Sequence, residues 1–220
     1  MNATTATLAE LAVTEPAAAR VFYRHRLDFC CGGRRPLEDA CRERQLDPKV
    51  ILDAIAAENP LIGERTRWEQ APLEALVAHI VTTYHQRLRV AMPELIALAR
   101  KVESRHASKP ECPRGLVAHL EAMHQSVLEH LGKEELILFP LIVAGLGSRT
   151  SAPVHVMELE HEHHGEDLQG IRRLTHDLVA PATACPTWRA LYLGLQQLEE
   201  ELMEHIHLEN NVLFRRALNA

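Results

Sequence analysis

The sequence of 220 residues lacks any apolar run long enough to cross a bilayer, since its longest uncharged apolar stretch extends only from Leu136 to Gly147. It also lacks an excess of basic charge, because 24 lysines and arginines face 30 acidic residues and leave a net charge of −6. We therefore expect neither a membrane nor a nucleic acid as partner. No basic stretch followed by an apolar segment stands near the first residue, so we expect no secretory signal.

Cysteine is sparse, and its odd count of five argues against a disulfide scaffold in a chain long enough to bury its own core. The expected compartment is the reducing cytoplasm. Histidine, by contrast, is abundant: the chain has 14, and 13 of them lie at or after His79. Because neutral imidazole is the commonest metal ligand, this asymmetry favours a metal site in the later part of the chain.

Prolines and glycines divide the chain into unequal parts. Residues 1–58 carry short helical patterns, and residues 59–71 form a polar stretch interrupted by Asn59-Pro60 and Gly63, which predicts a linker. Residues 72–220 carry four long patterns with apolar positions three or four apart, typical of amphipathic helices. The predicted fold is therefore all-α: an up-down four-helix bundle of the kind that holds metals, preceded by a small helical domain.

Two prolines fall within the long patterns. Pro93 lies inside the first, and Pro140 lies near the end of the second. Proline removes a backbone donor and clashes with the preceding turn, so we expect each of them to kink or stop its helix.

Polar residues interrupt the apolar stripes at positions that ought to be buried, and the interruptions repeat. His130 and His205 are each followed four residues later by a glutamate, Glu134 or Glu209. Residues at i and i+4 share one helical face, so each pair can point at a single metal centre. A buried imidazole or carboxylate without a partner costs on the order of several kcal/mol, so these positions need compensation.

The other two long patterns each contribute a lone histidine at matching positions. His85 precedes His130 by 45 residues, and His161 precedes His205 by 44, so the second helical hairpin resembles a repeat of the first. Four histidines and two glutamates would then converge. Six donors exceed the four of a structural zinc and suit two metals bridged by carboxylates. Iron, manganese and zinc all remain open on ligand type, and the two carboxylates leave a positive site that favours anions, O2 or NO.

One further histidine competes for the same role. His164 lies on the inward stripe three residues after His161 and is an alternative or additional ligand. The repeat offset maps His161 onto His85, so His161 is preferred. The string from His161 to Gly165 lacks the final histidine of a zinc protease motif, which excludes that class.

Cys30 and Cys31 stand beside a Gly-Gly pair, which predicts a turn. Adjacent cysteines rarely close a disulfide with each other without strain. Arg34, Arg35 and a nearby helix start favour a lowered thiol pKa and thus a redox or metal-transfer role. The alternative is that both are small buried apolar residues. Tyr84 is interpreted as a core residue, or as a contact of the ligand His85, rather than as a radical site.

Several segments together carry a family resemblance: Asp28-Phe29-Cys30-Cys31-Gly32-Gly33, Tyr84-His85, His130 through Glu135, Leu138-Phe139-Pro140, Glu160-His161-Glu162 and His205 through Phe214. In this ordered set the chain resembles the iron–sulfur cluster repair di-iron proteins, a hemerythrin-like family with a small N-terminal module. The likeness spans the whole chain. One departure is Arg215, which stands where the family commonly has proline after the final Leu-Phe.

The resemblance implies a non-haem centre of two iron ions bridged by oxo and carboxylate groups. Its terminal ligands would be His85, His130, His161 and His205, and its bridging carboxylates would be Glu134 and Glu209. Glu160, beside the third histidine, would support a ligand by an outer hydrogen bond. The resemblance also implies that Cys30 and Cys31 approach this centre.

The function implied is the repair of iron–sulfur clusters damaged by oxidative or nitrosative stress, by a cytoplasmic protein that supplies iron. Its partners would be the damaged iron–sulfur proteins, with O2, NO or peroxide as ligands of the centre. Two alternatives use the same bundle: a carrier or sensor of O2 or NO, and a di-iron nitric oxide reductase. The sequence leaves open whether the chain is an enzyme, whether it forms a homodimer, and whether the N-terminal domain docks on the bundle.

Overall fold

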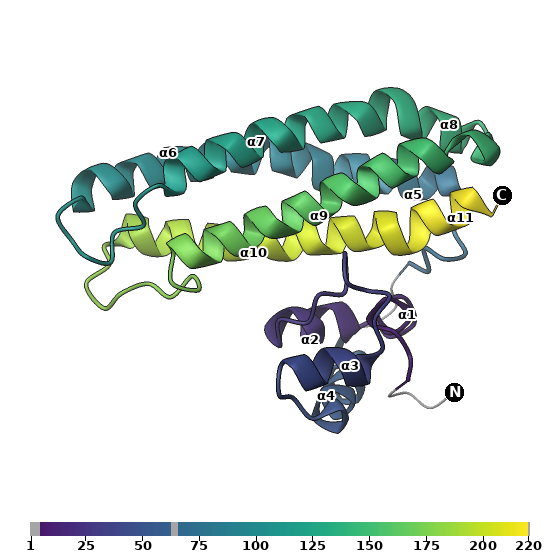
Figure 1. Cartoon of the computed structure of the whole chain (residues 1–220), viewed down its shortest axis with the longest axis horizontal. Helices are drawn as coiled ribbons and strands as arrows, with labels where there is room; N and C mark the ends of the chain where they lie inside the picture. The colour runs from purple at the N-terminus through teal and green to yellow at the C-terminus, as the bar shows by residue number, and fades with distance from the viewer. Residues whose placement is uncertain (1–4, 63–65, 220) are drawn as a thin grey trace.

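The computed structural model describes residues 5–62 and 66–219, and it contains helices and no strand within these ranges. The all-α prediction is therefore confirmed. The bundle is built from α5 (Leu73–Ile80), α6 (Gln86–His106), α7 (Leu116–Lys133), α8 (Phe139–Val143), α9 (Ser151–Leu174), α10 (Pro186–Leu208) and α11 (Phe214–Leu218). These elements form four antiparallel rods, namely α5–α6, α7–α8, α9 and α10–α11. The rods lie along the long axis of the molecule (Figure 1).

Three of the four rods contain a π turn, in which a backbone N–H bonds to the carbonyl five residues earlier. These turns are η1 (Val81–His85), η2 (Glu134–Leu138) and η4 (Glu209–Leu213). A π turn inserts one extra residue into the helix and is frequent at functional sites. Here η1 ends at His85, while η2 and η4 begin at Glu134 and Glu209. The apolar spacing of three and four did not predict these turns.

The apolar core of the bundle is split into two clusters along its length. One cluster includes Leu88, Leu120 and Trp188. The other includes Ile80, Phe139 and Phe214, toward the opposite end of the bundle. The predicted ligands stand between the two clusters along every rod, so a polar layer is enclosed by apolar side chains on both sides.

Neither proline within the rods ends its helix. Of the two expected outcomes at Pro93, a kink or a stop, the stop does not occur, because α6 continues through this residue to His106. Pro93 is exposed, so the carbonyl that loses its donor can face solvent. Pro140 falls in the first turn of α8, directly after the π turn η2, where a missing N–H is tolerated.

The N-terminal helices are α1 (Leu8–Thr14), α2 (Ala18–Arg24), α3 (Leu37–Glu43) and α4 (Pro48–Ile62). They surround an apolar cluster of their own that includes Phe22, Leu37 and Ile51. Helix α4 extends into the stretch 59–71 that the sequence predicts as a linker, and Gly63 lies outside the described residues. A short 3-10 turn, η3 (Gly147–Arg149), joins α8 to α9. Within the described residues, no helix is long and apolar enough to span a membrane.

The N-terminal helices dock on the bundle, which settles the point that the sequence leaves open. They gather on one side of it, and the loop between α2 and α3 reaches the bundle wall (Figure 1). The Asn211 side chain donates hydrogen bonds to the carbonyls of Phe29 and Cys30, at 3.2 and 3.4 Å. The Tyr23 hydroxyl donates to the carbonyl of Gln196 at 3.0 Å. These polar contacts fix the position of the loop that carries the cysteine pair.

Replacing Asn211 with alanine should loosen this loop by about 1–3 kcal/mol, because the buried Phe29 carbonyl loses its side-chain donor and the Cys30 carbonyl keeps only that of Asn210. The measurement is faster backbone hydrogen exchange at residues 28–33, with unchanged helical circular dichroism. Asn219→Ala is the matched control, since the Asn219 side chain donates to the Arg215 carbonyl at the exposed end of α11, away from this loop. Equal exchange in wild type and Asn211→Ala would show that this amide does not hold the loop.

Candidate metal centre

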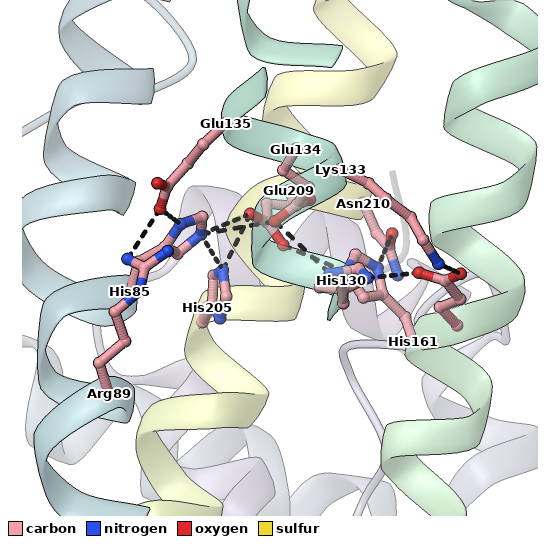
Figure 2. Close-up of polar contacts among 11 residues, drawn as sticks. His85, Arg89, His130, Lys133, Glu134, Glu135, His161, His205, Glu209 and Asn210 are labelled. Carbon is pink, nitrogen blue, oxygen red and sulfur yellow. Dashed lines mark hydrogen bonds and ion pairs between the residues drawn. The ribbon is translucent and has the colours of Figure 1, made fainter. Parts of the chain in front are cut away.

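Six side chains that the sequence selects as ligands meet in the polar layer of the bundle, and every rod contributes at least one of them. The six residues are His85, His130, Glu134, His161, His205 and Glu209. None of these side chains is more than 2% exposed. Figure 2 shows their polar ends converging between the rods. Residues four apart lie on the same face of a helix, as expected here. His130 with Glu134, and His205 with Glu209, point to the same interior region.

The donor atoms fall into two groups of four that share both carboxylates. One group contains His85 and His205 with Glu134 and Glu209, and the other contains His130 and His161 with the same two glutamates. The donor atoms of each group lie within 4.8 Å of one another. Each group could therefore hold a metal ion, and Glu134 and Glu209 belong to both groups.

The two groups pair histidines from different hairpins. Nε2 of His85 lies 3.1 Å from Nε2 of His205, so the first rod pairs with the fourth. Nε2 of His161 lies 3.0 Å from Nε2 of His130, so the third rod pairs with the second. The sequence repeat predicts which residues contribute but gives no sign of this cross-pairing.

Three of the four histidines are oriented by an acceptor on their outer side. Nδ1 of His85 hydrogen-bonds to Glu135 at 2.7 Å, and Nδ1 of His161 hydrogen-bonds to Asn210 at 2.8 Å. An Nδ1–H that donates to oxygen leaves the Nε2 lone pair directed inward, as a metal ligand requires. Glu135 and Asn210 are absent from the sequence prediction. Their positions in the sequence could have indicated this role, because each of them directly follows the ligand glutamate of its rod.

Glu160 is the third outer acceptor. It hydrogen-bonds to Nδ1 of His130 at 2.9 Å, and Lys133 forms an ion pair with it. The resemblance places Glu160 beside the third histidine, whereas its contact is with the second, His130, across the bundle. The Nδ1 of the fourth histidine, His205, is buried and has no hydrogen-bond partner among the described residues. The Tyr84 ring stacks on His205 at a centroid distance of 5.5 Å, so Tyr84 packs directly against a donor.

Burial disfavours the charged form of two of these histidines, His130 and His205. Desolvation and the neighbouring His161 hold the pKa of His130 well below its usual range. Desolvation also lowers the pKa of His205, although Glu209 opposes the shift. Neutral rings offer free lone pairs inward, which is the protonation state that binds metal.

The pKa values of the two buried carboxylates are shifted in opposite directions. Burial and the nearby charge of Glu209 raise the pKa of Glu134 well above its usual range. Burial opposes ionisation of Glu209 too, but His205 and the ring nitrogens of His161 and His85 outweigh it and hold its pKa well below normal.

Several oxygens of the pair lack partners. Both carboxylate oxygens of Glu134 and one of Glu209 are buried and have no hydrogen-bond partner among the described residues. Orphaned buried carboxylate oxygens are rare in folded proteins and call for a bound cation or water. The donor set therefore fits a metal centre.

His164 lies beside this centre and outside both donor groups. It is 1% exposed, and its ring packs edge-on against His130 at a centroid distance of 4.9 Å. Burial and the nearby His161 lower its pKa to about 3. Neither ring nitrogen has a hydrogen-bond partner within the described part of the chain. Of the two competing histidines, the structure places His161 in a donor group.

The cysteine pair approaches the centre from the side of α9. The Cys31 thiol donates to the backbone carbonyl of His161 at 3.3 Å, and Cys30 is buried against the core of the bundle. The predicted turn at these residues is confirmed, because the chain bends there without forming a helix.

The expectation of a lowered thiol pKa is wrong for Cys30. Its hydrogen bond with Cys31, its burial and the adjacent Asp28 carboxylate raise its pKa well above the usual value. The two arginines that motivated the expectation are paired elsewhere: Arg34 with Glu158 at 2.8 Å, and Arg35 with Glu43. The surroundings of Cys30 therefore favour the protonated thiol over an activated thiolate.

A buried layer of histidines and shared glutamates within four antiparallel rods defines a cation-binding bundle, and comparison with known proteins agrees. Residues 76–217 match the hemerythrin HHE cation binding domain, and residues 4–59 match a domain of unknown function, DUF542.

The chain is 45% identical to the iron-sulfur cluster repair protein YtfE of Yersinia pseudotuberculosis serotype IB (strain PB1/+). It is 48% identical to the protein of the same name from Edwardsiella ictaluri (strain 93-146). Each match covers 96% of both chains. The chain therefore belongs to the family of iron–sulfur cluster repair proteins with a hemerythrin-like domain.

Glu160→Gln should lower metal affinity by about 10–100-fold, because the His130 ring loses the carboxylate that orients it. Competition with a chelator measures the affinity. Glu166→Gln, an exposed position on the same helix, is the matched control and should leave affinity unchanged. Equal affinities for the two variants would show that the outer carboxylate has no role in holding the ring.

Proposed function

We propose that this chain holds two iron ions and supplies iron to iron–sulfur clusters damaged by oxidative or nitrosative stress. The observation that carries the proposal is the pair of four-donor groups that share Glu134 and Glu209. Four imidazole nitrogens and two carboxylates suit iron among the metals that such donors bind. The names of the relatives, iron-sulfur cluster repair protein, support the choice of client.

In this proposal each residue of the layer has a distinct task. His85 and His205 would hold one ion, His130 and His161 would hold the other, and Glu134 and Glu209 would serve both. Bound iron supplies one-electron chemistry and is also the cargo. The outer acceptors Glu135, Glu160 and Asn210 keep the rings aligned, while the apolar clusters above and below keep bulk water from the carboxylates.

Cys30 and Cys31 are the proposed transfer residues for iron that leaves the centre. Support comes from the contact of the Cys31 thiol with the His161 backbone and from two pockets, of about 310 and 290 Å³, that both cysteines line. All five cysteines are free thiols. Free thiols are typical of a reducing compartment, so we propose that the protein acts in the cytoplasm on damaged iron–sulfur proteins.

A carrier or sensor of O2 or NO is the second candidate. Each ion would receive two nitrogens and two carboxylates from the chain, and iron of octahedral preference would then keep positions for a small ligand. Reversible gas binding that does not need Cys30 and Cys31 would favour this function. Turnover of NO to N2O by the reduced protein would instead identify a nitric oxide reductase.

Iron content should depend on which donor is removed. Wild type should hold about two ions per chain. Glu134→Leu should lose both, because this carboxylate belongs to both donor groups, whereas His85→Ala should mainly lose one. Iron quantitation with a Mössbauer spectrum measures this, and His163→Ala, at an exposed position, is the control. Wild-type protein that takes up no iron would overturn the proposal.

Iron-loaded wild type should restore activity to a 4Fe–4S dehydratase damaged by peroxide under reducing conditions. Glu134→Leu should not restore it, because it lacks the bridging carboxylate. The Cys30→Ser/Cys31→Ser double variant should be slower than Cys185→Ser, a half-buried cysteine far along the chain that serves as control. Restoration by Glu134→Leu at the wild-type rate would contradict iron supply from this centre.

A further inference from the structure

A third group of possible metal donors, apart from the two histidine–glutamate groups, lies where the N-terminal helices meet the bundle. It consists of Asp28, Cys30 and Cys31, whose ligand atoms lie within 4.8 Å of one another. Among the described residues it is the only such group that contains sulfur. It shares no residue with the two histidine–glutamate groups, so it needs its own explanation.

The spacing of the three side chains fits a tetrahedral cation. The Sγ atoms of Cys30 and Cys31 are 3.7 Å apart. Two metal–sulfur bonds of about 2.3 Å at a tetrahedral angle put two thiolates about 3.8 Å apart. Oδ1 of Asp28 is 3.3 Å from Sγ of Cys30, against about 3.5 Å for an oxygen and a sulfur on one such cation. Little movement is therefore needed to bring all three onto one ion.

The loop holds this geometry through its backbone. Oδ1 of Asp28 accepts the N–H groups of Cys30 and Cys31, at 3.2 and 3.0 Å, which keeps the carboxylate next to the thiols. A Cβ at Gly33 would lie 2.4 Å from the carbonyl oxygen of Phe29, so this tight bend tolerates no side chain there. A Cβ at Gly32 would crowd Asp28 at 3.0 Å. The Gly-Gly pair thus keeps the three donors together.

The bundle supplies the other wall of the group. Asn210 donates to the Cys30 carbonyl at 3.3 Å, and the Cys31 thiol contacts the His161 carbonyl. Glu162 lines both of the pockets that the two cysteines line. Solvent or a carboxylate can therefore complete the coordination, and a site with an open fourth position allows exchange.

We propose that Asp28, Cys30 and Cys31 bind one thiophilic divalent cation, at a metal site separate from the histidine–glutamate centre. Binding forms two metal–thiolate bonds, and the two thiol protons leave to solvent. The three donors then carry three negative charges against two on the cation, and Arg35 lies close enough to Asp28 for their charges to interact favourably.

The two kinds of site differ in chemistry. Thiolates select softer cations, whereas imidazole and carboxylate suit harder ones. The sulfur site therefore goes beyond the proposed function, because it requires neither two iron ions at the centre nor any repair activity.

Cobalt titration of the full chain tests the proposal. The protein is first loaded with iron and then given Co²⁺ without oxygen. Thiolate-to-cobalt charge-transfer absorption reports only on sulfur ligands, and the histidine–glutamate centre has none. We expect absorption that saturates at one Co²⁺ per chain. Absence of this absorption in wild type would overturn the proposal.

Variants assign the signal to residues. Cys30→Ser and Cys31→Ser should each abolish it, and Asp28→Ala should weaken Co²⁺ binding at least tenfold. Cys185→Ser, at another half-buried cysteine, should leave it unchanged. Glu134→Leu should also leave it unchanged, so loss of the iron centre and loss of the sulfur site are observed separately. Absorption that survives in both cysteine variants would overturn the proposal, and unchanged affinity in Asp28→Ala would remove Asp28 from the site.

A second measurement uses only the wild-type chain and does not depend on how the variants fold. One equivalent of Cd²⁺ should slow alkylation of Cys31 at least tenfold relative to Cys185, since both are half-buried but only Cys31 has the two neighbouring donors. Mass spectrometry of the digested protein reports each cysteine separately. Equal slowing of the two, or of neither, would contradict a site at Cys31.

Discussion

The arrangement of the bundle interior depends on two carboxylates that lie fully buried among apolar side chains. Glu134 and Glu209 are 0% exposed, and three of their four oxygens have no hydrogen-bond partner among the described residues. Burying a charged carboxylate among apolar side chains is unfavourable, because the free energy of desolvating the charge exceeds what burial of its apolar neighbours contributes. Burial holds the pKa values of His130 and His205 below their usual range, so these two rings favour the uncharged form that offers a lone pair to a cation. A cation held between the rings and the carboxylates would offset this desolvation cost.

The π turns show how the backbone accommodates that layer. In an α-helix neighbouring side chains point about 100° apart, so two consecutive residues rarely serve one site. At η2, however, Glu134 faces the centre while Glu135 accepts from His85, and at η4 Glu209 faces the centre while Asn210 accepts from His161. In both rods the wider turn begins at the buried glutamate. An extra residue in each turn thus coincides with the two places where one helix supplies both a donor and its support.

Much of this arrangement can be predicted from the spacing of residues along each helix. The remainder depends on contacts between helices across the bundle. The apolar period predicts the rods, and the His-x3-Glu pairs predict which face carries donors, because both depend only on positions along one helix. The pairing of His85 with His205 depends on which rods are neighbours in space, and spacing carries no such information. The lowered thiol pKa was inferred from arginines nearby in sequence. In the fold these arginines pair with other acids, and the nearest charge to Cys30 is the Asp28 carboxylate.

The two halves of the centre differ in what orients their rings. The His85 ring is held by Glu135, which in turn pairs with Arg89 at 2.9 Å, and all three belong to the bundle. The His161 ring is held by Asn210, whose amide also donates to the Cys30 carbonyl of the N-terminal loop. The Cys31 thiol of the same loop also donates to the His161 carbonyl, so the N-terminal loop contacts the residues of this half at two points. The N-terminal helices are therefore mechanically connected to one half of the centre, and the cysteine pair lies at the point of connection.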